Sequence, residues 1–280
     1  MIRTLPCLVL LALAAPAAQA QQTPTCTGHV TTLPATLSTP GVWCLAADLG
    51  TAIASGEAIR VATSNVTLDC HGYRISGLAA GAATQAVGIG ATNKLNTVVR
   101  DCNVRGFHTA VALTGTTSGN VVEDVRSDGA TVRGLVVEGD GSAVRRNRIV
   151  DVGGSTFAPG GAWGIVTRGA VDVDGNLVDG LAALADGSGN IVGVGVLLND
   201  ADAAIVQDNR IRRATGGGAA PSTGIRVLTG TGVHIRGNLV ADADIGVRCV
   251  PAGSAAGDNH FAYVGTPLSG CRDDGNGVVP

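Results

Sequence analysis

The chain has 280 residues, and its 19 lysines and arginines against 22 aspartates and glutamates give a formal net charge of −3 at pH 7. This near-neutral balance lacks the excess of positive charge that binds nucleic acid or an anionic membrane surface, so neither is predicted as a partner. Aromatic residues make up only 2% of the chain, which leaves few side chains for stacking on sugar rings.

The first segment, residues 1–20, reads MIRTLPCLVLLALAAPAAQA: one basic residue, an apolar run, and small residues ending in Ala-Gln-Ala. This pattern is typical of a secretory signal peptide that is cleaved after Ala20. The apolar run is too short for a membrane span, and no later segment approaches about 18 uninterrupted apolar residues. The sequence therefore predicts a secreted or periplasmic protein without a membrane span.

The next segment, residues 21–64, contains three prolines and Trp43 and lacks the repeated phrase that follows it. A stack of repeats needs a cover at its open end, because that end exposes unpaired strand edges and core side chains. We therefore predict an N-terminal cap over 21–64. At the other end, residues 266–280 are polar and are predicted to form a loose tail beyond Cys271.

One short phrase returns seven times between Thr97 and Phe261. Apolar residues stand three positions before and two positions after a central slot, and Ser127 is the only exception. The slots are 21 to 33 residues apart, and five of the seven hold Asn: Cys102, Val125, Asn147, Asn176, Asn209, Asn238 and Asn259. Short β-branched segments separated by Gly, Asn and Asp favour strands over helices, and a fixed period indicates one coil of a solenoid for each copy.

A second phrase, a small residue followed by an aliphatic one, precedes each slot, as in Gly134-Leu135 and Gly164-Ile165. In a parallel solenoid these aliphatic residues would stack on their equivalents one coil away, and a buried Asn could donate and accept along its column. With these columns the sequence resembles the right-handed parallel β-helix, or pectin-lyase-like, superfamily. We predict an all-β, single-stranded right-handed parallel β-helix of about eight coils over residues 65–265.

Six cysteines remain after removal of the signal peptide, and an even number in an exported chain indicates disulfides. Cys70 and Cys102 end similar phrases one coil apart, so they should stack as neighbours. Cys26 would then pair with Cys44 in the cap, and Cys249 with Cys271 at the C-terminal end. There is no Cys-x-x-Cys motif and no cluster of His with Cys, so no metal site is predicted.

The repeats differ in length at one position. From the slot to the aliphatic residue of the next small-aliphatic phrase the chain takes 9 and 10 residues, then 18, 18 and 16, and finally 9. Insertions at one corner of successive coils stack on one side of a solenoid. The segments 151–163, 179–192 and 212–223 are therefore predicted to line a common lateral face that serves as the binding surface.

These segments and the strands that leave them supply carboxylates, guanidinium groups and one Trp. In a lyase or epimerase, a base removes the proton beside a uronate carboxylate whose charge an arginine or a cation neutralises. In a hydrolase, two carboxylates serve as acid and base. The candidate catalytic residues, which should then converge, are Asp151, Asp179, Arg212 and Arg226. The candidate substrate-binding residues are Trp163, Arg168, Asn190 and Arg213. The alternative is that these are solvated polar residues of loops.

The resemblance implies a polysaccharide lyase, a glycoside hydrolase or a uronate epimerase, but the sequence strings of those enzymes are missing. Neither Gly-His-Gly with Arg-x-Lys nor Asp-Pro-His-Glu occurs. We therefore expect a monomer that binds or processes an extracellular or cell-envelope polysaccharide, or alternatively a non-catalytic scaffold at a surface. No cofactor is predicted; calcium is the ion that the alternating acids of Asp172-Val173-Asp174 would permit.

Overall fold

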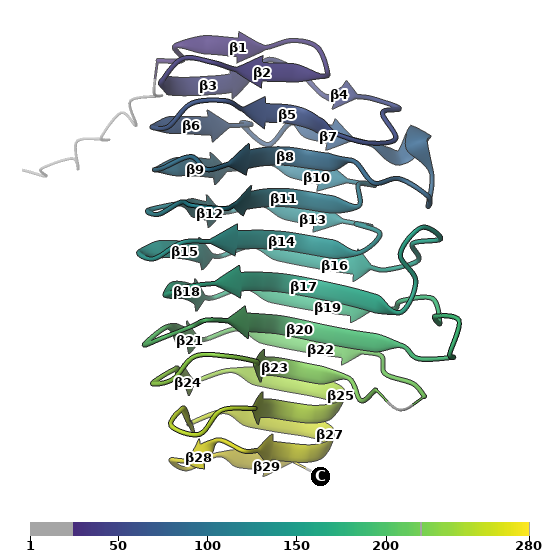
Figure 1. The fold of residues 1–280 in the computed structure, drawn as a ribbon, viewed down its shortest axis with the longest axis vertical. Coiled ribbons are helices and arrows are strands. Elements are labelled where there is room, and N and C mark those ends of the chain that lie inside the picture. The colour runs from purple at the N-terminus through teal and green to yellow at the C-terminus, as the bar shows by residue number, and fades with distance from the viewer. Residues whose placement is uncertain (1–24, 219, 280) are drawn as a thin grey trace, which may run out of the picture.

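The computed structural model describes residues 25–218 and 220–279, so the predicted signal peptide lies outside the described residues. The chain winds through three stacks of parallel strands, and each coil between the two ends visits each stack once (Figure 1). Stack 1 consists of β1 (Gly28–Val30), β3 (Gly41–Leu45), β6 (Val66–Asp69), β9 (Thr97–Arg100), β12 (Val121–Glu123), β15 (Ser142–Arg145), β18 (Val171–Asp174), β21 (Ile205–Gln207), β24 (His234–Arg236), β26 (Ala255–Gly257) and β28 (Arg272–Asp273).

Stacks 2 and 3 follow in each coil and join at the C-terminal end, where two long strands run through both. Stack 2 consists of β4 (Leu49–Gly50), β7 (Arg74–Ser76), β10 (Asn103–Arg105), β13 (Arg126–Asp128), β16 (Arg148–Val152), β19 (Leu177–Leu181), β22 (Arg210–Ala214), the first parts of β25 (Leu239–Cys249) and β27 (His260–Ser269), and β29 (Gly277–Val279). Stack 3 consists of β2 (Ala35–Leu37), β5 (Glu57–Val61), β8 (Val87–Thr92), β11 (Thr109–Thr114), β14 (Arg133–Glu138), β17 (Gly161–Arg168), β20 (Val192–Asn199), β23 (Thr223–Val227) and the second parts of β25 and β27.

The repeat columns become the core. Val122 lies in register with Val99 on one side and with Val144 on the other, and all three are fully buried. Each coil adds one such aliphatic rung, so burial of apolar surface continues along the whole axis. The predicted β-helix fold is confirmed by this register.

The asparagine slot forms a buried ladder, as the sequence predicts. The side-chain oxygen of Asn209 accepts hydrogen bonds from both the backbone N–H and the Nδ2 of Asn176, each over 2.9 Å. The Nδ2 of Asn176 also donates to the carbonyl of Val144, over 2.9 Å. The ladder runs from Asn147 to Asn276 and satisfies backbone groups that the corner leaves without a strand partner.

The parallel pairing extends beyond both predicted boundaries. β1 pairs with β3, and β2 with β5, inside the segment predicted as a cap. β28 and β29 pair with β26 and β27, so the segment predicted as a loose tail continues the stacks. Asn276 there supplies a further rung of the ladder, which the sequence reasoning missed because Asp273, three residues before it, interrupts the apolar column.

All three predicted disulfides are present: Cys26–Cys44, Cys70–Cys102 and Cys249–Cys271, with Cα–Cα distances of 5.8, 4.7 and 5.0 Å. Cys102 occupies the asparagine slot of its coil, so a covalent bond there takes the place of the hydrogen-bonded rung. In the part of the chain that the structure describes, no helix has the length and apolar character needed to cross a membrane.

Candidate functional site

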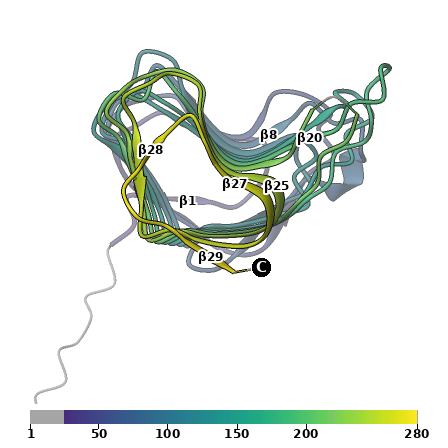
Figure 2. The same ribbon diagram turned by 90° about the horizontal axis from the view of Figure 1, so that it is seen from below.

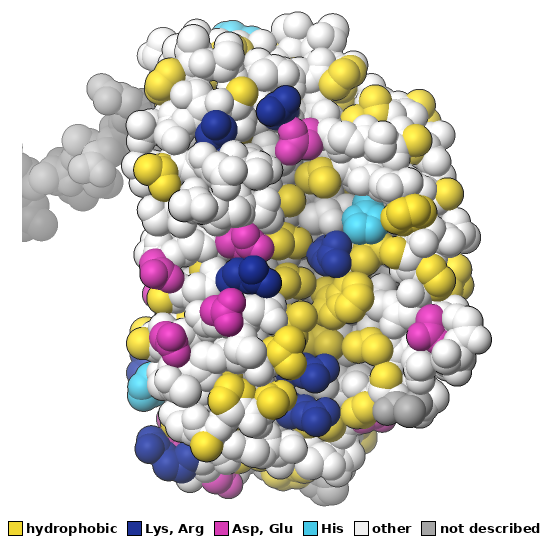
Figure 3. All heavy atoms as spheres, viewed as in Figure 1, with side chains coloured by type: hydrophobic (Ala, Val, Ile, Leu, Met, Phe, Trp, Pro, Cys, Tyr) yellow, Lys and Arg dark blue, Asp and Glu magenta, His cyan; other side chains and the backbone are white. Residues whose placement is uncertain are grey.

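The outward face of stack 3 is hollow. Seen along the axis, the stack curves inward between a wall of loops at its junction with stack 2 and a second wall of turns leading to stack 1 (Figure 2). The space-filling view shows a trough with an apolar floor between these two walls (Figure 3). We call this surface, from β8 to β27, the groove.

Glycines of the small-aliphatic phrase lie where stack 3 packs closely against side chains of stack 2. A Cβ on Gly164 would lie 2.5 Å from the Cγ1 of Val178, which fills the core from stack 2. Gly134 and Gly195 stand in the same relation to Ile149 and Ile211. A Cβ would collide with the core at these three positions, so glycine fits the close approach of the two stacks there.

The register corrects one repeat alignment. Ile165 pairs with Val196, so the phrase of that coil is Gly195-Val196 rather than Gly193-Val194, which the sequence spacing suggested. The structure also adds a wall segment before the first repeat: the connection from β7 to β8 includes a 3-10 helix, η1 (Leu78–Ala80). The repeat count began after this segment and therefore did not include it.

Hydrogen bonds join the loops into one continuous wall. The backbone N–H of Thr156 donates to the carbonyl of Ala82, across two coils with short connections. The backbone N–H of Gly160 donates to the carbonyl of Leu184, and Ile191 exchanges backbone hydrogen bonds with Gly217. These hydrogen bonds fix the backbone of each loop relative to its neighbours, as a binding surface requires.

Two columns of outward side chains form the floor of the groove. The middle of the second column is aliphatic and partly exposed: Val136 pairs with Val166, and Val166 with Leu197. The first column holds Arg133 and Trp163 in register. From β8 to β27 the paired residues of these two columns include arginines but no carboxylate.

Aromatic and basic side chains meet where the floor joins the loop wall. The guanidinium carbon of Arg133 lies 5.3 Å from the ring centroid of Trp163, a cation–π distance. The rings of His108 and Phe157 make an edge contact with centroids 6.5 Å apart, and Phe157 comes from the loop 153–160. Burial lowers the pKa of Arg133, and burial together with the charge of Arg133 lowers the pKa of His108.

Further along the floor, Arg226 of β23 lies in register with Arg248 of β25. Both side chains are partly buried, and the Nε of Arg226 is buried without a hydrogen-bond partner. Burial, followed by the charge of Arg248, lowers the pKa of Arg226.

A second cluster lies on stack 2, on the other side of the loop wall. Asp179 accepts hydrogen bonds from Arg212 at 2.8 Å and from Arg213 at 2.6 Å. The hydrogen bond from Arg213 is the main cause that holds the pKa of Asp179 below its usual value. Asp151 and Arg213 border a cavity of about 370 Å³ at this edge.

The structure therefore divides the predicted site. Asp151, Asp179, Arg212 and Arg213 lie together on stack 2, whereas Arg226 belongs to stack 3. The predicted convergence of the four catalytic candidates does not occur for Arg226, because the loop 215–222 carries the chain from one stack to the next between Arg213 and Arg226.

The predicted substrate-binding residues are divided as well. Trp163 lies on the floor of the groove. Arg168 ends β17, and its Nε lies 3.7 Å from Asp200. Asn190 lies in the loop wall, where its backbone N–H donates to Asp186. Sequence reasoning missed Arg133 and Arg248, although each adjoins a small-aliphatic phrase, as Arg226 also does.

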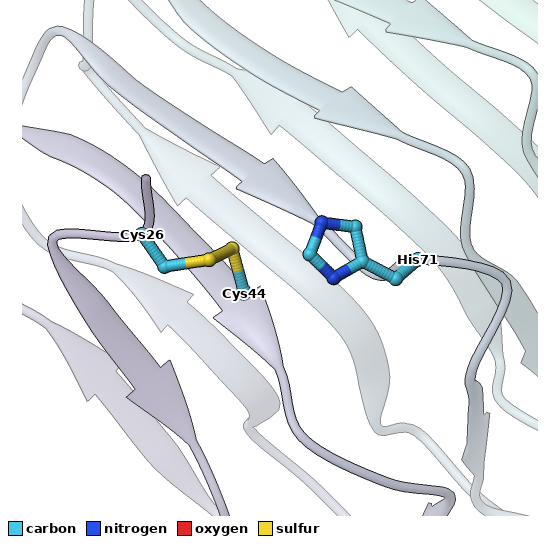
Figure 4. A group of neighbouring side chains, drawn as sticks. All are labelled: Cys26, Cys44 and His71. Atoms are coloured by element: carbon cyan, nitrogen blue, oxygen red, sulfur yellow. A yellow bond between two sulfur atoms is a disulfide. The ribbon is translucent and has the colours of Figure 1, made fainter. Parts of the chain in front are cut away.

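One group of potential metal ligands is a disulfide instead. Cys26, Cys44 and His71 have ligand atoms within 4.8 Å of one another, and Figure 4 shows them side by side. The two sulfurs are bonded to each other, so neither is a free thiolate for a metal. His71 Nε2 lies 3.6 Å from Asp69.

Neither the models of known protein families nor the sequences of curated proteins match this chain. Among solved structures it is similar to a GH136 lacto-N-biosidase from Eubacterium ramulus, with a TM-score of 0.59 and 9% identity over 89% of this chain and 59% of that one. It is also similar to a tailspike double mutant of E. coli bacteriophage HK620 in complex with pentasaccharide, with a TM-score of 0.51 and 14% identity over 86% of this chain and 60% of that one.

The chain thus spans about 60% of the length of these two proteins. At such low identity the similarity concerns the fold and not the chemistry of a site. The parallel register of the three stacks and these similarities together identify the chain as a right-handed parallel β-helix.

Proposed function

We propose that this protein is exported and binds an extracellular or cell-envelope polysaccharide along the groove of stack 3. The observation that carries the proposal is the floor of the groove, where Trp163 and Arg133 adjoin the aliphatic rungs of Val136, Val166 and Leu197. Sugar rings have apolar faces that pack on aromatic and aliphatic side chains, and hydroxyl groups that bond to polar ones.

The shape of the groove suits a linear ligand. Adjacent strands lie about 4.8 Å apart, so the three aliphatic rungs extend over about 10 Å, the length of roughly two sugar rings. Both walls follow the axis of the solenoid, so a longer chain could continue past these rungs in either direction (Figure 3).

The similar structures give support of a weaker kind. The tailspike protein is described in complex with a pentasaccharide, and the other protein is a lacto-N-biosidase. Both are proteins of glycan recognition built on the same fold. The three disulfides of this chain favour an oxidising compartment outside the cytoplasm, which is where such glycans occur.

We propose binding rather than cleavage. Hydrolysis with two carboxylates needs an acid and a base that both face the sugar. The two floor columns from β8 to β27 carry no carboxylate. Asp179, the most buried of the predicted acids, lies on stack 2 and is engaged by both Arg212 and Arg213.

Affinity electrophoresis and calorimetry of the purified protein with acidic and neutral polysaccharides test the proposal, while reducing ends and unsaturated uronate are followed in the same samples. Trp163→Ala should weaken binding about tenfold, or 1.4 kcal/mol. Tyr73→Ala, which removes an aromatic ring from the turn between stacks 1 and 2, is the matched control and should bind normally. Equal affinity of the Trp163→Ala variant and the wild type would contradict packing of the glycan on the Trp163 end of the floor, and release of product would exclude simple binding.

A further inference from the structure

Two arginines stack on adjacent strands of the groove floor without an acidic partner. Arg226 and Arg248 pair in register, and each follows the buried aliphatic residue of its strand, so both side chains point out of the core into the groove. Among the described residues, no carboxylate forms an ion pair with either, and the Nε of Arg226 donates to nothing although it is buried. Figure 3 shows basic side chains on the floor at this end of the trough.

This arrangement of two arginines is unfavourable by itself. Like charges directly opposite one another on adjacent strands destabilise a sheet, and partial burial removes water that would screen them. The lowered pKa of Arg226, caused first by burial and then by Arg248, reflects the same two effects. Packing alone does not require two charges here, because Leu197 occupies the same column one rung earlier.

Several other arginines of the chain have acidic neighbours. Arg145 and Arg146 both contact Glu123, at 2.8 and 2.9 Å. Arg105, whose Nε is also buried without a partner, lies in register with Asp128 on stack 2. Arg226 and Arg248 differ in that the residues beside them in their column, Leu197 and Ser269, are uncharged.

We propose that Arg226 and Arg248 form a subsite for an anionic substituent of the glycan, a carboxylate, sulfate or phosphate group. Two guanidinium forks one strand apart can donate several charge-assisted hydrogen bonds to such a group, and its charge removes the repulsion between them. The inference rests on the proposed function, because it places the anionic group on a glycan in the groove. It makes the ligand an acidic polysaccharide, with sugar rings over Val166 and Leu197 and the acid at the arginines.

The test compares a polygalacturonate, the same polymer with its carboxyl groups reduced, and dextran sulfate, all at one ionic strength because salt screens charge. Sodium glucuronate and sodium sulfate serve as small probes, with glucose as the neutral reference, and thermal unfolding reports their binding. The variants are Arg226→Gln and Arg248→Gln. Arg148→Gln is the matched control, since Arg148 is an exposed strand arginine of stack 2 for which no acidic partner is present among the described residues.

We expect each of the two groove variants to bind at least one acidic polymer about tenfold more weakly than the wild type, because a charge-assisted hydrogen bond is lost. Carboxyl reduction of the polygalacturonate should have a comparable effect if the group is a carboxylate, whereas a preference for dextran sulfate would identify a sulfate-like group. Arg148→Gln should bind as the wild type does. Stabilisation by the small anions should disappear only in the groove variants.

Two results would overturn the inference. If polymers bind in a manner that depends on Trp163 but not on charge or on either arginine, the anion subsite is wrong while glycan binding stands. If no polymer binds and no small anion stabilises the protein, both proposals are wrong. Stabilisation by sulfate or glucuronate that is lost in the groove variants, without any binding of polymer, would support the anion subsite and reject the glycan.

Discussion

Asn147 donates both its backbone N–H and its side-chain Nδ2 to the side-chain oxygen of Asn176, each over 2.9 Å. The same pattern repeats along the ladder: the side-chain oxygen of each asparagine accepts hydrogen bonds from the asparagine one coil before, and its own N–H groups donate to the asparagine one coil after. Both residues are at most 2% exposed, so a lost acceptor could not be replaced by bulk water.

Asn176→Ala should therefore lower the free energy of unfolding by about 3 kcal/mol, because it leaves two buried donors of Asn147 and the carbonyl of Val144 without their partner. Urea denaturation followed by circular dichroism measures this. Asn199→Ala, which removes one 3.3 Å bond at the edge of stack 3, is the control and should cost less than about 1 kcal/mol. Similar losses in the two variants would contradict the role of the ladder.

Gly164→Ala should destabilise the protein by about 1 to 3 kcal/mol, because the new methyl group would lie 2.5 Å from both Val178 Cγ1 and the carbonyl oxygen of Gly195. Gly187→Ala is the matched control, since a Cβ there has no neighbour within 4 Å and its φ lies outside the left-handed region. Thermal unfolding of both variants decides the matter. If Gly164→Ala is tolerated as well as Gly187→Ala, the close approach of the two stacks does not require glycine there.

Asp179→Asn tests whether this carboxylate is structural or serves the ligand. Its contacts with Arg212 and Arg213 predict a loss of about 1 to 2 kcal/mol of stability, a modest value because both arginines are largely exposed to solvent. Glycan binding should stay within about twofold of wild type, because the residue lies outside the groove. Asp258→Asn, at an exposed turn with a positive φ, is the control. Loss of binding in Asp179→Asn with unchanged stability would restore a functional role for this residue.

The same residue gives a pH dependence. Since the folded-state pKa of Asp179 is lowered, mainly by the hydrogen bond from Arg213, the unfolded chain takes up the proton first as the pH falls. The stabilisation is complete above the unfolded pKa of about 3.9 and is lost as the pH falls through the lower folded value. The stability of Asp179→Asn should therefore approach that of the wild type in strong acid. A constant difference between them from pH 7 down to about pH 2 would contradict this reading.

His108 should make stability depend on pH nearer to neutrality. Burial, with the charge of Arg133, lowers its folded-state pKa, so the folded protein resists protonation that the unfolded chain accepts below about pH 6.5. The wild type should lose stability between about pH 7 and 5, and His108→Gln should lose less. Urea midpoints at these pH values give the comparison, with His29→Gln as the control. Parallel profiles for the wild type and His108→Gln would show that this imidazole does not contribute.

Much of the fold could be predicted from the sequence, because a solenoid repeats the same short-range requirements in every coil. The asparagine slot, the aliphatic columns and the pairing of Cys70 with Cys102 all follow from register between neighbouring coils. The two ends were harder to predict. β1 continues stack 1 and β29 continues stack 2, although the coils to which they belong lack the full repeat pattern. An end coil buries one face and needs fewer of the defining residues.

The candidate site depended on information that the sequence pattern does not contain. Inserted loops indicated which corner is elaborated, but Arg213 and Arg226 lie on different sides of that corner, on stack 2 and stack 3. The meeting of Arg133 with Trp163, and of Arg226 with Arg248, required knowing which outward positions share a column of stack 3. The sequence by itself determined the repeating contacts along the axis, because these are nearly identical from coil to coil. Only the tertiary structure decided which side chains share the groove, because that depends on the direction in which each corner turns.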